Sequence, residues 1–140
     1  MGSIELTGDE FERFLRTASH GRPIVMINLL HYREQALYAA DAGAEACSGR
    51  EAYARYGAHV VPLLANAGGR AIWAGRIAAS VIAPPGERWD DAVLIEYPSN
   101  AAFVGMVTSS AYQMIAFHRT AALADSRLIA SETTVPFSDQ

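Results

Sequence analysis

Hydrophobic residues make up 51% of the 140 residues and charged residues only 19%, and the formal net charge is −4. A chain of this length forms one domain that buries a hydrophobic core without disulfides, and the lone Cys47 has no partner in the chain for a bridge. Because the eleven Lys and Arg residues are scattered, we expect no binding of nucleic acid.

The low charge also bears on assembly and location. A charge-poor surface favours a second copy of the chain that covers apolar area. The N-terminus lacks the basic and apolar regions of a signal peptide, and no later stretch is apolar for long enough to span a membrane. We therefore expect a cytoplasmic protein that does not interact with membranes.

The chain opens with a predicted helix and a predicted strand. Thr7 and Glu10 fit a capping box at the start of a short helix that ends near Thr17. Residues 24–30 then form a continuous apolar run that only Asn28 interrupts. Such a run is typical of a strand that is buried on both faces.

The middle of the chain predicts a loop and a long amphipathic helix. Residues 33–47 are rich in alanine and weakly periodic, so we expect a loop with a helical turn. Ser48 and Glu51 fit a second capping box, and the helix that they begin ends at Gly68. Pro62 lies inside this helix and predicts a kink, because it removes one intrahelical hydrogen bond.

Three further strands are predicted in the second half. Residues 70–82 and 91–97 flank the turn residues 84–86 and should form a hairpin. Residues 127–132 form the last strand. Two helical segments lie between the strands at 91–97 and 127–132, and Ser99 or Asn100 caps the first of them.

The second of these helical segments carries the most unusual residue of the chain. Ser109 or Ser110 caps it, and it runs to about Ala124. On a helical wheel, Arg119 falls near the centre of its apolar arc. We therefore expect the Arg119 guanidinium to face the sheet and to be partly buried.

The order of the predicted elements defines a fold class. After the leading helix it is βαββαβ, the α+β ferredoxin-like arrangement of an antiparallel sheet with two helices on one face. The helices leave the other face of the sheet uncovered, and a second copy of the chain covers it most simply, so we expect a homodimer. The predicted organisation is an N-terminal helix and linker at 1–22, a domain at 23–132 and a C-terminal tail at 133–140.

Several short motifs occur in the order and spacing of a known family. The motifs are Met26-Ile27-Asn28-Leu29-Leu30, Tyr56, Gly68-Gly69-Arg70, Glu96-Tyr97-Pro98-Ser99, Tyr112-Gln113 and His118-Arg119. Together they resemble the domain of unknown function 1330 family, within the dimeric α+β barrel superfamily, over residues 23–130. The resemblance implies two ferredoxin-like subunits that form a shared barrel, with a ligand cavity in each between sheet and helices. The alanine-rich insert at 33–47 departs from the family pattern and is a candidate lid.

The resemblance supplies no reaction, because relatives with this architecture include monooxygenases, lactone isomerases, haem-degrading enzymes and peroxidases. The residues themselves give two candidates. Arg119 and Glu96 are costly to bury unless they are paired or bind a ligand. If the strand face of Glu96 meets the helices, the two either form a structural ion pair or both face a ligand. In the second case, Arg119 holds a carboxylate or enolate oxygen and Glu96 acts as a general acid or base.

Four other polar residues are candidate substrate contacts. Asn28 either holds a substrate carbonyl or makes a structural hydrogen bond. Tyr56 and Tyr112 either pack in the core or line the cavity as donors. Ser99, in the cap after the third strand, is the fourth.

The histidines complete the candidate site. The four histidines show no paired spacing of the metal-site kind and there is one cysteine, so we expect no metal and no cofactor. His31 follows the first strand and His118 precedes Arg119, and either is an acid–base group or a haem ligand. We assign His31 to catalysis with Glu96 and Arg119, and His118 to substrate binding.

These residues lead to one leading hypothesis and two alternatives. The leading hypothesis is a cofactor-independent enzyme that acts on a small polar organic substrate with a carbonyl or carboxylate group. The first alternative is a dimer that binds or senses a small molecule without catalysis. The second is a haem-binding or monooxygenase-like protein.

Overall fold

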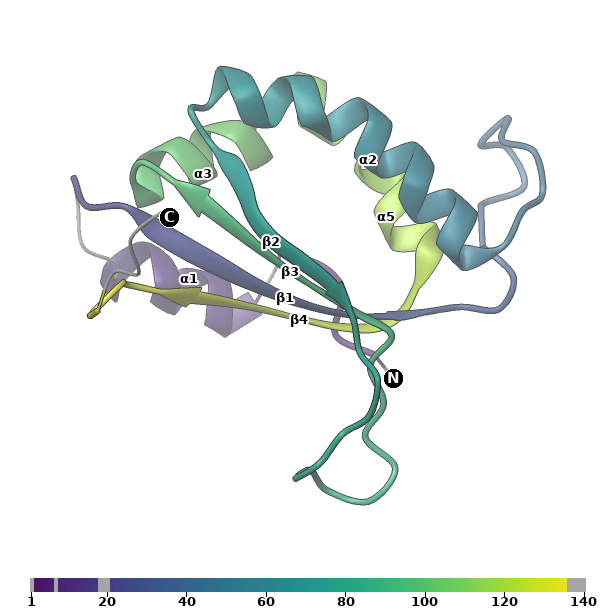
Figure 1. The fold of residues 1–140 in the computed structure, drawn as a ribbon. Helices are drawn as coiled ribbons and strands as arrows, with labels where there is room; N and C mark the ends of the chain where they lie inside the picture. The colour runs from purple at the N-terminus through teal and green to yellow at the C-terminus, as the bar shows by residue number, and fades with distance from the viewer. Residues whose placement is uncertain (1, 7, 18–20, 136–140) are drawn as a thin grey trace.

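The computed structural model describes residues 2–6, 8–17 and 21–135 (Figure 1). Its elements in chain order are α1 (Gly8–Thr17), β1 (Ile24–Tyr32), α2 (Gly49–Asn66), β2 (Arg70–Arg76), β3 (Asp91–Tyr97), α3 (Asn100–Val107), α4 (Ser110–Gln113), α5 (Ala116–Ala122) and β4 (Leu123–Ser131). The four strands form an antiparallel sheet in the order β2-β3-β1-β4. The predicted α+β class and βαββαβ order are confirmed.

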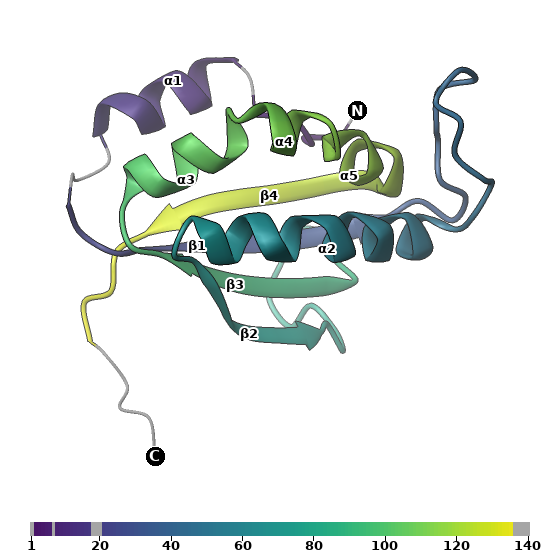
Figure 2. The same cartoon turned by 90° about the horizontal axis from the view of Figure 1, so that it is seen from above.

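The helices pack on one face of this sheet, as Figures 1 and 2 show for α2, α3 and α5. Figure 2 also shows α1 alongside α3, where the Phe14 and Phe103 rings meet edge to face at 5.8 Å. The main core lies between sheet and helices and joins Ile24 and Met26 of β1 to Tyr56 and other side chains of α2 and α3.

The burial of β1 alternates along the strand. Ile24, Met26 and Leu30 are buried under the helices, whereas Val25 and Ile27 are only half-buried on the opposite face. The prediction of a strand buried on both faces is therefore wrong for the single chain, because the helices cover only one side. We call the uncovered side the open face.

Local capping rules account for the starts of α2, α3 and α4. The Ser48 hydroxyl accepts a hydrogen bond from the Glu51 amide at 3.0 Å, and the Glu51 carboxylate accepts one from the Ser48 amide at 2.9 Å, so this capping box is confirmed. Ser99 caps α3 and Ser109 caps α4. The first predicted capping box includes Thr7, which lies outside the described residues.

The structure differs from three of the predictions about secondary structure. The strand predicted for 70–82 ends at Arg76, and residues 77–90 leave the sheet as a long loop (Figure 1). The Ile77 amide still bonds the Asp90 carbonyl, but the side chains of Val81 and Ile82 further along are 92% and 97% exposed. Because no layer of the described residues packs against this apolar stretch, burial of its side chains does not favour a longer pairing of β2 with β3.

The other two differences lie around the last helix and in the insert. The segment predicted to run to Ala124 is divided into α4 and α5, and β4 begins at Leu123 because α5 leads directly into the strand. Residues 33–47 form a loop with a tight turn from Ala39 to Ala42, not the predicted helical turn. No helix among the described residues is both long and apolar enough to cross a membrane.

Candidate functional site

A group of tyrosines lies in the core between the sheet and α2. The hydroxyls of Tyr56 and Tyr112 are 2.9 Å apart, and both side chains are buried. Tyr53 packs against Tyr56 with a ring separation of 5.3 Å. Burial raises the pKa of Tyr53 and that of Tyr56, so both hydroxyls stay protonated at neutral pH. They are hydrogen-bond donors in this position and not general bases.

Arg119 lies at the edge of the same group, as its place in the apolar arc predicts. Its side chain is half-buried, and Nη1 donates a hydrogen bond to the Ile4 carbonyl at 2.6 Å. Its positive charge partly offsets the effect of burial on the pKa of Tyr53 and of Tyr56. The guanidinium therefore links the N-terminal segment to α5 through this hydrogen bond.

Glu96 lies on the other side of the sheet. It pairs with Val25 in register, and both point to the open face, whereas the adjacent Tyr97 is buried under the helices. Its carboxylate accepts a hydrogen bond from Arg70 Nε at 3.2 Å. The condition for a Glu96 and Arg119 site is not met, because the pleat places the two groups on opposite faces.

The side chains of Asn28 and Ser99 form hydrogen bonds with backbone groups in the structure. Asn28 Nδ2 donates to the carbonyls of Met26 and Val93 at 3.4 and 3.3 Å, and the residue is buried. The Ser99 hydroxyl accepts from the Ala102 amide at 3.1 Å. Asn28 therefore makes structural hydrogen bonds, the alternative to substrate binding that the sequence allowed, and Ser99 acts as a helix cap.

His31 forms a close pair with an aspartate that the sequence did not single out. His31 Nδ1 donates to Asp90 Oδ2 at 2.9 Å, and the Tyr32 amide donates to the same oxygen at 2.8 Å. Burial acts to raise the pKa of Asp90, but these two hydrogen bonds outweigh it and hold the pKa below its usual value. An ionised Asp90 fixes the His31 tautomer and leaves Nε2 free to exchange a proton.

The pair lies in a polar pocket of about 820 Å³, formed where β1 ends, where α2 begins and where the chain approaches β3. Arg33, Arg50 and Arg88 contribute three guanidinium groups. Arg50 pairs with Asp91 at 3.0 Å, whereas Arg33 Nε is buried without a hydrogen-bond partner among the described residues. In that part of the chain, Arg33 therefore keeps an unused N–H donor and lines the same pocket as His31.

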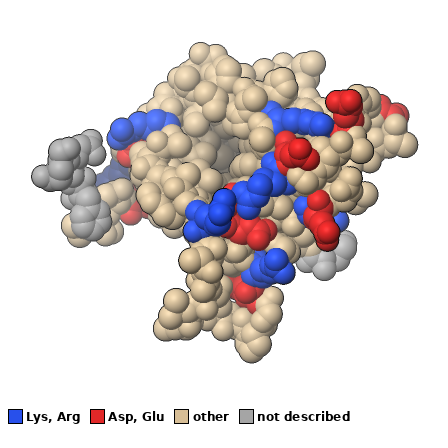
Figure 3. Space-filling model, turned by 45° about the vertical axis from the view of Figure 1, so that its right-hand side comes forward, with Lys and Arg blue, Asp and Glu red and all other residues tan. Residues whose placement is uncertain are grey.

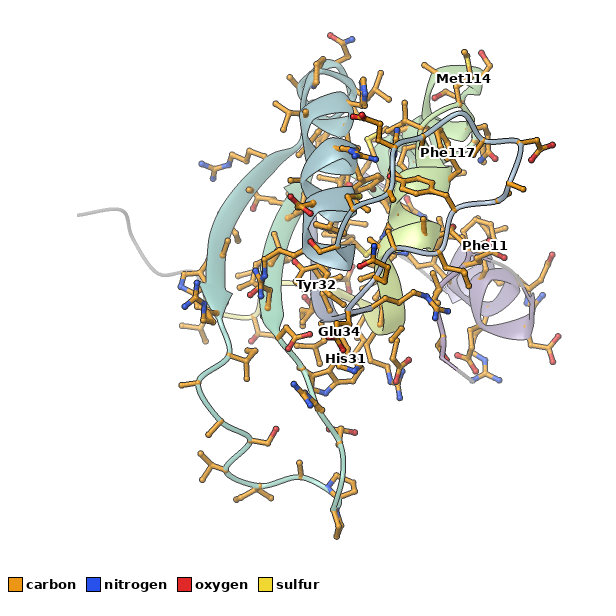
Figure 4. The ribbon with its side chains drawn as sticks, turned by 90° about the vertical axis from the view of Figure 1, so that its right-hand side faces the viewer. Phe11, His31, Tyr32, Glu34, Met114 and Phe117 are labelled. Atoms are coloured by element: carbon orange, nitrogen blue, oxygen red, sulfur yellow. The ribbon has the colours of Figure 1, made fainter. Side chains whose placement is uncertain are left out.

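The figures locate this pocket on the molecule. His31, Tyr32 and Glu34 lie close together at the end of β1 in Figure 4. Figure 3 shows acidic and basic side chains interleaved on one face of the molecule, without a large region of one sign. This distribution suits a small polar ligand better than an extended polyanion.

His118 belongs to a different group. Its Nδ1 forms a hydrogen bond with the Tyr38 hydroxyl at 2.7 Å, and its ring stacks on that of His59 with the ring centroids 5.7 Å apart. Burial lowers the pKa of His118, and the nearby His59 and Arg55 lower it further. Tyr38 also lines an apolar pocket of about 580 Å³ between the insert and α5.

The predicted site is therefore distributed over several places. Neither pocket is lined by Asn28, Tyr56, Tyr112 or Arg119, and the insert contributes residues to both. Sequence reasoning missed Asp90, Arg33, Arg88 and Tyr38. The first three lie next to the ends of β1 and β3, a signal that was available, whereas Tyr38 lies in an insert without a pattern.

An antiparallel sheet of this order with helices on one face defines a ferredoxin-like α+β protein. The family model described as domain of unknown function (DUF1330) matches residues 44–133, and the chain belongs to this family. The RPA0582 protein of unknown function from Rhodopseudomonas palustris has a similar structure, with 38% identity and a TM-score of 0.87 over 97% of this chain and 100% of that one. A search of curated proteins found no match.

Two more distant structures share the fold alone. One is a dimeric protein of unknown function and ferredoxin-like fold from Bacteroides fragilis, with 14% identity and a TM-score of 0.51 over 82% of this chain and 100% of that one. The other is the hydroxynitrile lyase from Passiflora edulis, with 12% identity and a TM-score of 0.57 over 84% of this chain and 99% of that one.

Proposed function

We propose that this protein is a cofactor-independent enzyme that binds a small organic carboxylate with a carbonyl group in the polar pocket. The observation that carries the proposal is the His31 and Asp90 pair, with 2.9 Å between nitrogen and oxygen, in a pocket lined also by Arg33, whose Nε has no hydrogen-bond partner among the described residues. A histidine oriented by an ionised aspartate is an effective general base near neutral pH.

Four residues of the pocket have a role in such a reaction. Arg33 and Arg88 attract the substrate carboxylate. His31 Nε2 takes a proton from the carbon next to the carbonyl, and the electron pair of the broken C–H bond moves to the carbonyl oxygen as an enolate. Asp90 stabilises the imidazolium, which then returns the proton to carbon or oxygen.

The test is exchange of deuterium into 2-oxobutyrate in D₂O, followed by proton NMR. We expect the protein to accelerate loss of the C3 proton signal, and His31→Gln to reduce the rate by about 10² to 10⁴. Asp90→Asn should reduce it less and change its pH profile, because Asp90 acts through His31. His59→Gln is the control, since His59 is an exposed histidine that does not line the polar pocket. Equal rates for the wild type and His31→Gln would refute the assignment.

A binding protein without catalysis is the second candidate. It is favoured by the buried residues of the predicted site, because their polar groups are already occupied by structural hydrogen bonds. The hydroxyls of Tyr56 and Tyr112 bond each other, and the Asn28 amide bonds backbone carbonyls. Saturable binding of 2-oxobutyrate that Arg33→Gln abolishes, without exchange above the buffer rate, would support it against the enzyme. The haem alternative stays a prediction, and added haem without a Soret shift would contradict it.

We also propose a homodimer through the open face of the sheet. Trp73, Leu94, Ile27 and Ile129 lie opposite one another across the four strands on this face. Trp73 is 51% and Ile129 49% exposed, which is unusual for apolar side chains aligned in a row. The ferredoxin-like neighbour from Bacteroides fragilis is dimeric, which adds support.

Light scattering after size-exclusion chromatography tests the dimer. We expect the wild type to elute with twice the chain mass and Ile129→Lys to elute as a monomer. Val61→Lys is the matched control, because Val61 is 60% exposed but lies on α2, away from the open face. A monomeric wild type, or a dimeric Ile129→Lys variant, would contradict the proposed interface.

A further inference from the structure

We propose that the apolar pocket between the insert and α5 is a second binding site, for a small organic amine with an aromatic or alkyl body. This pocket of about 580 Å³ shares no lining residue with the polar pocket. The insert forms one wall, α5 forms another, and Glu5 of the N-terminal segment contributes a carboxylate.

The apolar part of the site is built from exposed and small side chains. Leu37 is 66% and Phe117 is 40% exposed, so both leave apolar surface in water that a ligand would cover. Figure 4 shows Phe117 beside the insert. Four of the lining side chains are alanines, at positions 39, 42, 116 and 121, which leave room for a ligand.

The walls of the pocket are held in place. The Leu37 amide donates to the Ala121 carbonyl at 2.9 Å, which joins the insert to the end of α5. The Tyr38 ring meets Phe117 at 5.8 Å, and its hydroxyl bonds His118 at 2.7 Å and accepts from Arg55 at 3.3 Å. The pocket is therefore formed before a ligand arrives, which reduces the entropic cost of binding.

Charge selects an amine over an acid. The only contact of the Glu5 carboxylate among the described residues is with the Thr120 hydroxyl at 3.5 Å, and no basic side chain there pairs with it. The cationic Arg55 donates to the Tyr38 hydroxyl and lies over the Tyr38 ring, 5.7 Å from its centroid, but it does not line the pocket. An ammonium group can therefore pair with Glu5 while the apolar body of the ligand contacts Phe117, whose ring also attracts cations.

The probe is 2-phenylethylamine, compared with the neutral 2-phenylethanol and the anionic 3-phenylpropionate, in titrations followed by amide NMR shifts. We expect the amine to bind up to about fivefold more tightly than the alcohol, as one exposed ion pair provides, and the acid to bind most weakly. Glu5→Gln should remove the preference for the amine, and Phe117→Ser should weaken amine and alcohol together.

His31→Gln separates this proposal from the function proposed for the polar pocket. It should leave amine binding unchanged, since His31 does not line the apolar pocket. Equal affinity for amine and alcohol would overturn the proposal, as would the absence of shifts around Phe117 at about 10 mM amine, a concentration above the Kd of a weak specific site.

Discussion

The paired hydroxyls of Tyr56 and Tyr112 make a sharp stability prediction. Both side chains are at most 8% exposed and their oxygens are 2.9 Å apart. Replacing one by phenylalanine leaves the other O–H buried without its partner, which costs about 1–3 kcal/mol. Replacing both removes the pair and leaves an apolar contact of the same shape, so the double variant should lie within about 1 kcal/mol of the wild type.

Urea unfolding of the wild type, both single variants and the double variant measures this cycle. In thermal unfolding, each kcal/mol corresponds to about 4 °C in Tm for a domain of this size. Tyr97→Phe is the control, because its hydroxyl makes no hydrogen bond among the described residues, so its removal leaves no partner unpaired and should cost less than either single variant. If the losses of the two single variants add in the double variant, the hydroxyls are not coupled as the structure has them.

Two further predictions concern alkaline stability and a helix cap. Because burial raises the pKa of Tyr53, of Tyr56 and of Tyr97 in the fold, their contribution to stability is complete below pH 10 and is lost as the pH rises further. Each of these tyrosines should then lower the free energy of unfolding by up to about 1.4 kcal/mol per pH unit. Urea unfolding at several pH values from about 9 to 11 measures this loss, and a free energy of unfolding that does not fall with pH over this range would contradict the raised pKa values. Ser109→Ala should cost about 1 kcal/mol in urea, since its hydroxyl accepts from the Tyr112 amide at 3.2 Å, whereas exposed Ser110→Ala should have almost no effect. Equal losses would mean that the cap is misassigned.

Local rules predicted the parts of the fold that depend on neighbouring residues. The capping box of Ser48 and Glu51 joins residues three positions apart, so its outcome is contained in the sequence. The alternation of Glu96 with Tyr97 was equally readable, but not which of them faces the helices. That choice depends on the packing of α2 and α3, which bury Tyr97 with Phe103 at 5.1 Å.

The candidate site required still more distant information. Arg119 was correctly expected to be partly buried, yet its partner is the carbonyl of Ile4, 115 positions away. No pattern in the N-terminal segment predicts that contact. Tyr38 reaches His118 for the same kind of reason, because the insert folds back on α5.

The His31 and Asp90 pair shows how register converts two unremarkable residues into a candidate catalytic group. Leu30 is paired with Asp91, and the Asp90 amide donates to the Leu30 carbonyl at 2.7 Å. His31, which follows Leu30, and Asp90, which precedes Asp91, therefore lie opposite each other on the same face of the sheet. A slip of one residue between β1 and β3 would turn one of these side chains to the opposite face and separate them. The register is specified by the apolar side chains of β1 that α2 and α3 bury, such as Met26. Packing of the core therefore fixes the proposed proton-transfer pair at the end of the sheet, although Met26 itself does not line the polar pocket.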